Sequence, residues 1–234
     1  MFSQKFLVKR FATALVLQNK VSTHTSMKQF HSSRLTGKVA IVTASTDGIG
    51  LAIAQRLGNE GASVVISSRK EKNVQSALEK LRGEGINVEG VVCHVGDPAQ
   101  RKNLIEFTKK KFGGIDILVS NAAVNPDVSP ILEPLGAYSV SKTALVGLTK
   151  AISNEVVGEN IRVNCVAPGV VPTKFASAIT SNEMGAEVSL SNVPMKRFGK
   201  ASEIAAAVAF LVSDDASYMT GQTLVVAGGT HAHL

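Results

Sequence analysis

The sequence predicts an α/β fold built on one doubly wound parallel sheet. Short runs of apolar, mostly β-branched residues alternate with longer segments of helical periodicity. The strand-like runs are apolar throughout, which is typical of strands covered by helices on both faces. With 234 residues, 44% of them hydrophobic and 18% charged, the chain is long enough and apolar enough for a sizeable core. We expect a single domain over residues 35–230.

The first strand–turn–helix unit is the most informative stretch. Residues 38–50 read KVAIVTASTDGIG, a buried strand followed by a turn and a helix that opens near Gly48. In such a unit, free backbone N–H groups and the positive end of the helix dipole converge on one spot. Gly48 and Gly50 would let a pyrophosphate approach the backbone closely. The stretch therefore predicts a dinucleotide phosphate site, with an ordinary strand–helix turn as the alternative.

The remaining elements follow in regular order. Helices are predicted over residues 49–58, 71–82, 98–112 and 138–157, and strands over residues 63–68, 88–93, 115–120 and 161–166. Glycines end the first two helices, and the third begins with Pro98 and ends with lysines, as the helix dipole favours. Strands that alternate with helices in this way lie parallel in one sheet.

The end of the second predicted strand favours NADP over NAD. Proteins that bind NAD place an acidic residue there to hold the ribose hydroxyls. This sequence has Ser68 and Arg69 instead, and a guanidinium suits a 2′-phosphate. A solvated basic loop is the alternative. The turn before Gly48, here called the phosphate turn, contains the negative charge of Asp47, which argues mildly against NADP.

The basic character of the chain is confined to its first part. The first 46 residues hold seven of the 25 basic side chains and none of the 18 acidic ones, so the rest of the chain is neutral. This distribution predicts no nucleic-acid surface. The two cysteines, Cys93 and Cys165, each end an apolar run and are expected to be buried and reduced. The five histidines lack metal-ligand spacing, so no metal is predicted.

Residues 1–33 have the character of a targeting leader. They are rich in Ser, Thr, Lys and Arg, lack acids, and place Leu7, Phe11 and Leu15 on one face if helical. This profile is typical of a mitochondrial transit peptide, with a disordered basic arm as the alternative. The apolar runs are too short to span a membrane.

A second candidate targeting signal lies at the C-terminal end of the sequence. The last three residues, Ala232, His233 and Leu234, fit the small–basic–leucine pattern of peroxisomal signals. The sequence therefore predicts a mitochondrial or a peroxisomal location.

Tyr138 and Lys142 open the long helix that precedes the last predicted strand. Their i, i+4 spacing places them on one helix face. An ammonium near a phenol favours the phenolate and lowers the phenol pKa towards working pH. Tyr138 is therefore a candidate proton donor to a carbonyl oxygen, although the pattern also occurs by chance in helices.

These motifs in this order resemble the short-chain dehydrogenase/reductase family, which has a Rossmann-like fold. The matching stretches are residues 43–50, 120–123, 138–142, 161–169 with Thr173, and 218–229. Within the family, TASTDGIG, ISSRK, CHVGD and SNAAVNP resemble the member 4 subgroup of NADPH-dependent carbonyl and retinal reductases, which are typically tetrameric.

The resemblance implies a binding site for NADPH or NADP and a role for each residue in it. The residues are Thr43, Ser45, Gly48, Ile49 and Gly50 at the pyrophosphate, Ser68 and Arg69 at the 2′-phosphate, Val95 and Asn121 at the adenosine, and Val171 and Thr173 at the carboxamide. Tyr138 would donate the proton, and Lys142 would bind the nicotinamide ribose and tune Tyr138. Residues 174–198 would form a mobile flap over the substrate.

The sequence departs from the family pattern between Asn121 and Tyr138. The family places there a helix with a catalytic Asn and a fifth strand with a catalytic Ser, but this interval is short and contains three prolines, which exclude both elements. Ser129 is the only hydroxyl nearby, and the join lies near Glu133. The fold is thus predicted to be one helix–strand unit short, roughly 50 residues with its loops. We expect a six-stranded sheet in which residues 161–166 move in beside residues 115–120.

The predicted function is hydride transfer from NADPH to a ketone or aldehyde carbonyl, with activity impaired by the missing Ser and Asn. Reduction of 3-oxoacyl groups is the alternative within enzymes. A non-catalytic, cofactor-binding or subunit-pairing variant is the alternative outside them. A homo-oligomer is expected from the resemblance, weakened here because the missing helix would normally pack subunits together.

Overall fold

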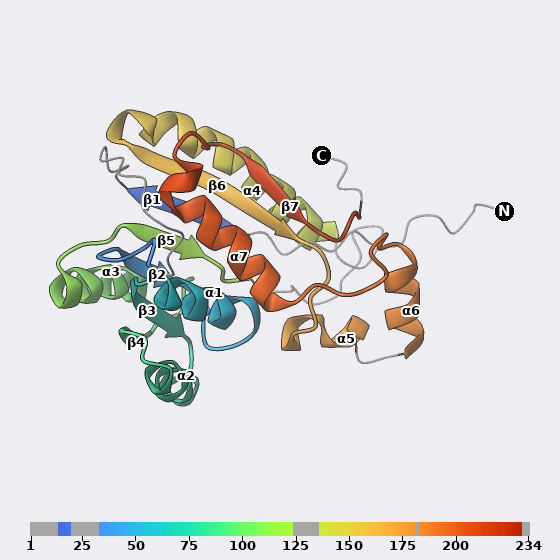
Figure 1. Cartoon of the computed structure of the whole chain (residues 1–234), viewed down its shortest axis with the longest axis horizontal. Coiled ribbons are helices and arrows are strands. Elements are labelled where there is room, and N and C mark those ends of the chain that lie inside the picture. The colour runs from blue at the N-terminus through green and yellow to red at the C-terminus, as the bar shows by residue number, and fades with distance from the viewer. Residues whose placement is uncertain (1–13, 20–32, 124–135, 181–182, 231–234) are drawn as a thin grey trace.

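A computed structural model describes residues 14–19, 33–123, 136–180 and 183–230 of the chain (Figure 1). Most of the predicted leader, the interval 124–135 with Ser129 and the predicted join, and the C-terminal tripeptide lie outside the described residues.

One seven-stranded sheet forms the centre of the molecule, with the strand order β4-β3-β2-β5-β1-β6-β7. Its strands are β1 (Ala14–Asn19), β2 (Val39–Val42), β3 (Ser63–Ser68), β4 (Val88–Val92), β5 (Ile117–Ser120), β6 (Ile161–Pro168) and β7 (Thr223–Val226). Every neighbouring pair is parallel except the two pairs that include β1. The α/β, Rossmann-like fold predicted from the sequence is confirmed.

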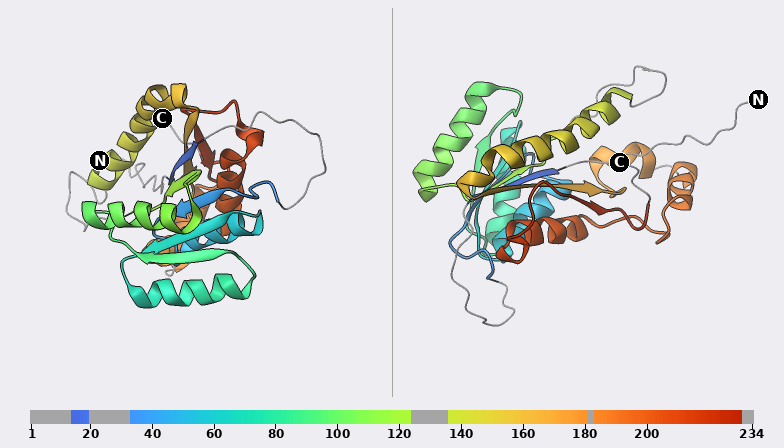
Figure 2. Two further views of the ribbon diagram at one scale, coloured as in Figure 1. Left: turned by 90° about the vertical axis from the view of Figure 1, so that its left-hand side faces the viewer. Right: turned by 90° about the horizontal axis from the view of Figure 1, so that it is seen from above.

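Helices cover both faces of the sheet, as the apolar strands require (Figure 2). One face carries α1 (Gly48–Asn59), α2 (Glu71–Gly83) and α7 (Ala201–Val212), and the other carries α3 (Pro98–Phe112) and α4 (Gly136–Val156). Shorter helices complete the structure. η1 (Val157–Glu159) follows α4, and η3 (Asp214–Ala216) follows α7. The chain after β6 forms η2 (Lys174–Ala176), α5 (Ser177–Thr180) and α6 (Glu183–Ser191). No element is predicted for residues 201–212, which are apolar enough to lack a clear polar face.

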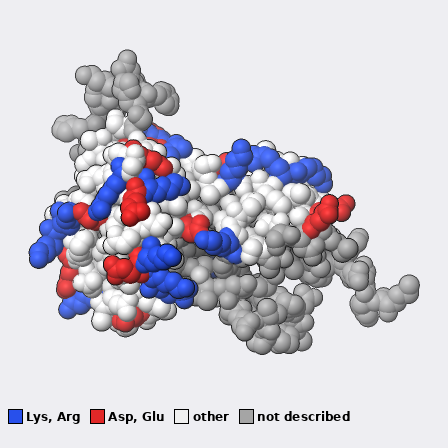
Figure 3. Space-filling view, turned by 90° about the horizontal axis from the view of Figure 1, so that it is seen from below, with Lys and Arg blue, Asp and Glu red and all other residues white. Residues whose placement is uncertain are grey.

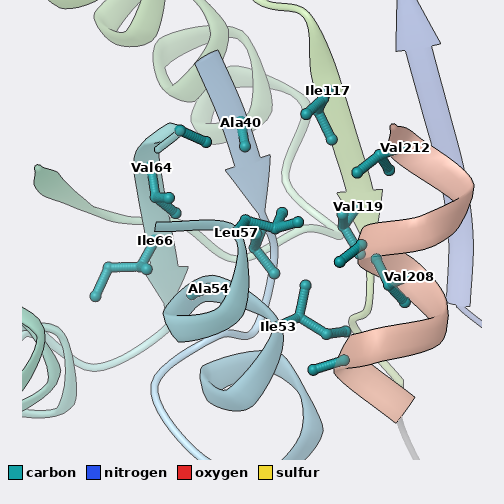
Figure 4. Close-up of a cluster of buried hydrophobic side chains, with 14 of the residues drawn as sticks. Ala40, Ile53, Ala54, Leu57, Val64, Ile66, Ile117, Val119, Val208 and Val212 are labelled. Atoms are coloured by element: carbon teal, nitrogen blue, oxygen red, sulfur yellow. The ribbon is translucent and has the colours of Figure 1, made fainter. Parts of the chain in front are cut away.

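The main core lies between the sheet and the pair α1 and α7 (Figure 4). Ile53 and Leu57 of α1 pack against strand residues on one side and against Val208 of α7 on the other. Alternate strand residues serve opposite faces, because successive side chains of a strand point in opposite directions. Thus Val64 belongs to this core, whereas Val65 packs with the α3 side of the sheet.

The predicted six-stranded sheet is wrong. β6 does not move in beside β5, because β1 lies between them and pairs antiparallel with both. β1 comes from the predicted leader, and at Leu15 the chain is extended and not helical. Its sequence, ALVLQN, opens with four apolar residues, a pattern that suits a strand enclosed on both faces.

Residues 174–198 are more regular than their polar sequence indicates. They contain η2, α5 and α6, the last of which is nine residues long. The described residues between Lys174 and Ser191 are therefore helical.

The surface matches the neutral charge balance of the body. Basic and acidic side chains are interspersed over much of the face shown in Figure 3. Among the described residues, no helix is both long and apolar enough to cross a membrane.

Candidate functional site

The turn between β2 and α1 is held in shape by two buried hydroxyl side chains. Ser45 Oγ donates to the Val42 carbonyl over 2.5 Å and accepts a hydrogen bond from the Ser67 amide over 3.1 Å. Thr43 Oγ1 donates to the Val119 carbonyl over 3.3 Å, which ties the turn to β5. Both side chains are buried, so they fix the path of the turn from within.

Asn121, directly after β5, braces the same turn from the side of the cleft. Its amide nitrogen Nδ2 donates to the carbonyls of Thr43 and Ala44, each over 3.1 Å. Its backbone amide donates to Thr43 Oγ1 over 3.0 Å. Asn121 therefore acts in this structure as a support for the phosphate turn.

Gly50 is required by the close packing of this turn. A Cβ atom at Gly50 would collide with the carbonyl oxygen of Ala44, and would lie 2.5 Å from Asn121 Nδ2 and 2.9 Å from Ser45 Cα. Ala44 has a φ of 50°, a left-handed conformation that costs a non-glycine residue roughly 1–2 kcal/mol. The surrounding hydrogen bonds hold this strained conformation in place.

These features border a cleft of about 240 Å³ at the carboxyl edge of the sheet. Its lining combines the phosphate turn, the end of β5 and the segment after β6: Ala44, Asp47, Gly48, Ile49, Gly50, Asn121, Ala123, Thr173 and Lys174. The first amides of α1 lack an intrahelical acceptor, as at any helix N-terminus. The cleft therefore offers backbone donors and the positive end of a helix dipole to an anion.

An ion pair crosses the mouth of the cleft. Lys174 Nζ lies 2.7 Å from Asp47 Oδ2, while Asp47 Oδ1 accepts the Gly48 amide over 2.8 Å and caps α1. The hydrogen bond from Lys174, followed by that from Gly48, lowers the pKa of Asp47 despite its partial burial. Lys174 neutralises the one acid in the phosphate turn, and no motif in the sequence indicated this residue.

The other predicted cofactor residues lie in two places, at the ends of β3 and β4 and in the segment after β6. Ser68 is half-buried and Arg69 exposed at the end of β3, and Val95 is half-buried after β4. Thr173 lines the cleft, and a Cβ on Gly48 would lie 3.1 Å from its Cγ2. Val171 is buried in the main core, so its side chain helps anchor the end of β6.

The two candidate catalytic residues lie in the first two turns of α4. Lys142 is half-buried, and burial lowers the pKa of its ammonium, whereas charge interaction with Cys165 of β6 acts in the opposite direction. Tyr138 is a helical residue whose side chain lies outside the described part. The described residues contain no cluster of His, Cys, Asp or Glu that could hold a metal ion.

Two family models match neighbouring parts of the chain, with an overlap at residues 129–135. The model described as short chain dehydrogenase matches residues 38–135, and the model described as Enoyl-(Acyl carrier protein) reductase matches residues 129–231.

Curated relatives match along nearly their whole length. Tropinone reductase-like 3 of Erythroxylum coca is 47% identical over 254 residues, covering 88% of this chain and 98% of the relative. Dehydrogenase/reductase SDR family member 4 of Oryctolagus cuniculus is 45% identical over 249 residues, covering 86% of this chain and 96% of the relative. Because 88% of 234 residues is about 206, the 254-residue match to the first relative includes about 48 positions without a counterpart here.

Solved structures share the fold. L-sorbose reductase from Gluconobacter frateurii, complexed with NADPH and L-sorbose, has a TM-score of 0.78 and 28% identity, covering 87% of this chain and 100% of that one. A short chain dehydrogenase from Burkholderia cenocepacia in complex with NADP has a TM-score of 0.75 and 26% identity, covering 85% and 100%. The cofactors bound in these two structures agree with the one predicted from the sequence. By its relatives, its family models and its fold, this chain belongs to the short-chain dehydrogenase/reductase family of oxidoreductases.

Proposed function

We propose that this chain binds NADPH in the cleft beside α1 and is a carbonyl reductase by descent. The observation that carries the proposal is the braced phosphate turn, where Gly50 leaves space that a Cβ would fill and Asn121 holds the backbone in place. The absence of an acid at the end of β3, where Ser68 and Arg69 stand, supports NADPH over NADH. The relatives named as tropinone reductase-like and SDR family member 4 support a carbonyl substrate.

The lining of the cleft supports part of the NADPH site that the resemblance implies. Gly48, Ile49 and Gly50 would bind the pyrophosphate, and Thr173 would contact the carboxamide end. When bound, the cofactor supplies the hydride. Tyr138 would hold the proton for the carbonyl oxygen, and the ammonium of Lys142 would keep the pKa of that phenol low.

We further propose that turnover is weak. The family carries a catalytic Ser on the strand beside β5, but in this structure that position belongs to Ala14–Asn19, whose sequence contains no hydroxyl side chain. Loss of one hydrogen-bond donor to a developing oxyanion costs roughly 3–4 kcal/mol, or about 10²–10³ in rate. About 48 positions of the tropinone reductase-like relative have no counterpart in this chain, which supports a missing helix–strand unit.

Two alternative functions each have one specific observation in their favour. The lack of a hydroxyl beside β5 favours a non-catalytic variant that binds cofactor or pairs with other subunits. The match to the enoyl-(acyl carrier protein) reductase model favours acyl substrates, as in 3-oxoacyl reduction.

Pairing with a second copy is supported by α4. Val140 and Leu148 are 67% and 45% exposed, and with the exposed Ala144 and Gly147 they form an apolar face at helical spacing. We propose a homo-oligomer through this face, weaker than in relatives that carry the additional helix.

The test compares three proteins: the chain itself, its Tyr138→Phe variant, and a version that lacks residues 1–20 and carries a homologous helix–strand unit after Glu133, so that the inserted strand takes the place of β1 between β5 and β6. NADPH binding is measured by fluorescence, and turnover with NADPH and a reactive dicarbonyl. We expect all three to bind NADPH and only the repaired version to turn over rapidly. Failure of the chain to bind NADPH would overturn the proposal. Turnover within tenfold of the repaired version would overturn the proposed impairment.

A further inference from the structure

The strand β1 occupies an internal position of the sheet although it comes from the N-terminal segment (Figure 1). It pairs with residues 117–120 of β5 on one side and with residues 161–166 of β6 on the other. We propose that Ala14–Asn19 is a permanent structural strand, which fills a strand-accepting slot between β5 and β6 and is retained in the folded protein.

The burial of the neighbouring strand β6 explains why a strand is needed between β5 and β6. Val163, Cys165 and Val166 of β6 are fully buried, and α7 packs against β1 as well as against β6. With β1 removed, β5 and β6 would face each other about 10 Å apart, two strand spacings. Each would then present a row of N–H and C=O groups without strand partners, which is costly in a buried setting.

The direction of β1 is compatible with a strand that belongs to the same chain as β5 and β6. Because β1 is antiparallel to its neighbours, it ends at the sheet edge where β2 begins. The path from β1 to β2 must pass one strand, β5, a separation of about 10 Å. The thirteen residues 20–32 can span up to roughly 43 Å.

The structural role of β1 is incompatible with cleavage of the predicted leader, residues 1–33. A leader cleaved near residue 33 would take β1 with it and open the slot between β5 and β6. We therefore infer that the folded protein keeps residues 14–19, and that N-terminal processing and completion of the sheet exclude each other.

The register provides a direct test in the full-length chain. Residue 15 lies opposite the native Cys165. Antiparallel partners have Cα separations of about 4.5–5.5 Å, within the roughly 4.4–6.8 Å range of disulfides. A Leu15→Cys variant should therefore form a 15–165 disulfide under mild oxidation, mapped by mass spectrometry. Val16→Cys is the matched control, because residue 16 lies opposite Asn164 in the register and not opposite a cysteine.

The outcomes are distinct. An intramolecular disulfide in Leu15→Cys but not in Val16→Cys supports the proposal. No disulfide in folded Leu15→Cys, or equal crosslinking in both variants, overturns it. A disulfide-linked dimer also overturns it, because the occupant would then be a second copy.

A second measurement tests whether the slot needs its strand. Chains that begin at residue 13 and at residue 21 are compared by hydrogen exchange. We expect the shorter chain to lose protection at β5 and β6, or to fail to fold, and a peptide of residues 12–21 to restore protection. Unchanged protection in the shorter chain would overturn the proposal.

Discussion

The carboxylate of Asp47 and the ammonium of Lys174 lie 2.7 Å apart at the mouth of the cleft beside α1. The pair joins the first turn of α1 to the segment that follows β6. Both side chains are largely exposed, at 54% for Asp47 and 92% for Lys174, so the pair adds little to folding stability. Its position predicts an effect on cofactor binding instead.

Lys174→Ala should weaken NADPH binding by roughly three- to tenfold, because the unneutralised Asp47 then repels the pyrophosphate. The midpoint of thermal unfolding should stay nearly constant. Titration of NADPH at low and high salt measures the effect, which should shrink as salt screens the charges. The double variant Asp47→Asn with Lys174→Ala should regain most of the affinity, and a double variant as weak as Lys174→Ala alone would refute this explanation.

Gly50→Ala should destabilise the phosphate turn and abolish measurable NADPH binding. The new Cβ would collide with the Ala44 carbonyl and crowd Asn121 Nδ2, so the turn must shift. Forced overpacking of this kind costs about 1–3 kcal/mol. Gly83→Ala at the end of α2 is the control, since a Cβ there would have no atom within 4 Å. If both variants unfold and bind NADPH alike, the packing argument fails.

Much of this architecture could be predicted from the sequence, because local signals and tertiary structure agree. The ends of β3 at Ser68 and of α3 at Phe112 match the predicted limits. In α3, Asp97 caps the first turn and Gly113 ends the helix in a left-handed conformation. These elements are specified by nearby residues, which a single sequence displays.

The features that sequence reasoning missed depend on distant residues. The placement of Leu15 depends on the slot between β5 and β6, more than a hundred residues further along the chain, and basic flanking residues gave the segment the character of a leader. Lys174 gains its role only when the end of β6 returns to the phosphate turn. The one signal available for β1 was its apolar run ALVL, which a helix and a strand can both accommodate.

Arg69→Asp should reverse the preference for NADPH. A guanidinium at the end of β3 can pair with the 2′-phosphate, and an aspartate there would repel it while accepting ribose hydroxyls. We expect NADPH affinity to fall at least about 30-fold, equivalent to about 2 kcal/mol. Lys110→Asp, with the same charge change in the last turn of α3 at the opposite sheet edge, should leave the ratio of NADPH to NADH affinities unchanged. Equal affinity of the unaltered chain for both cofactors would contradict the assignment.

Glu60 connects the start of the domain to the end of α1. Its carboxylate accepts hydrogen bonds from Arg34, at 2.8 and 3.0 Å, and from Arg56, and Arg34 also reaches Asp215 at 3.0 Å. Glu60 is only 5% exposed. Burial by itself raises the pKa of this carboxyl, but the hydrogen bonds from Arg34 and Arg56 outweigh burial, and the pKa lies below its usual value.

This lowered pKa predicts how folding stability depends on pH. The unfolded chain, with a glutamate pKa of about 4.3, binds a proton at a higher pH than the folded chain does. The stabilisation is therefore complete above that value and is lost as pH falls through the lower pKa of the folded state. Glu60→Gln should lower the free energy of unfolding at pH 7 by about 1–3 kcal/mol and flatten its decline below pH ~5. Glu106→Gln, at an exposed position of α3, is the control for loss of one negative charge. Urea unfolding between pH 3 and 7 measures both variants, and equal acid slopes for the two would show that the ion pairs of Glu60 do not set the acid stability.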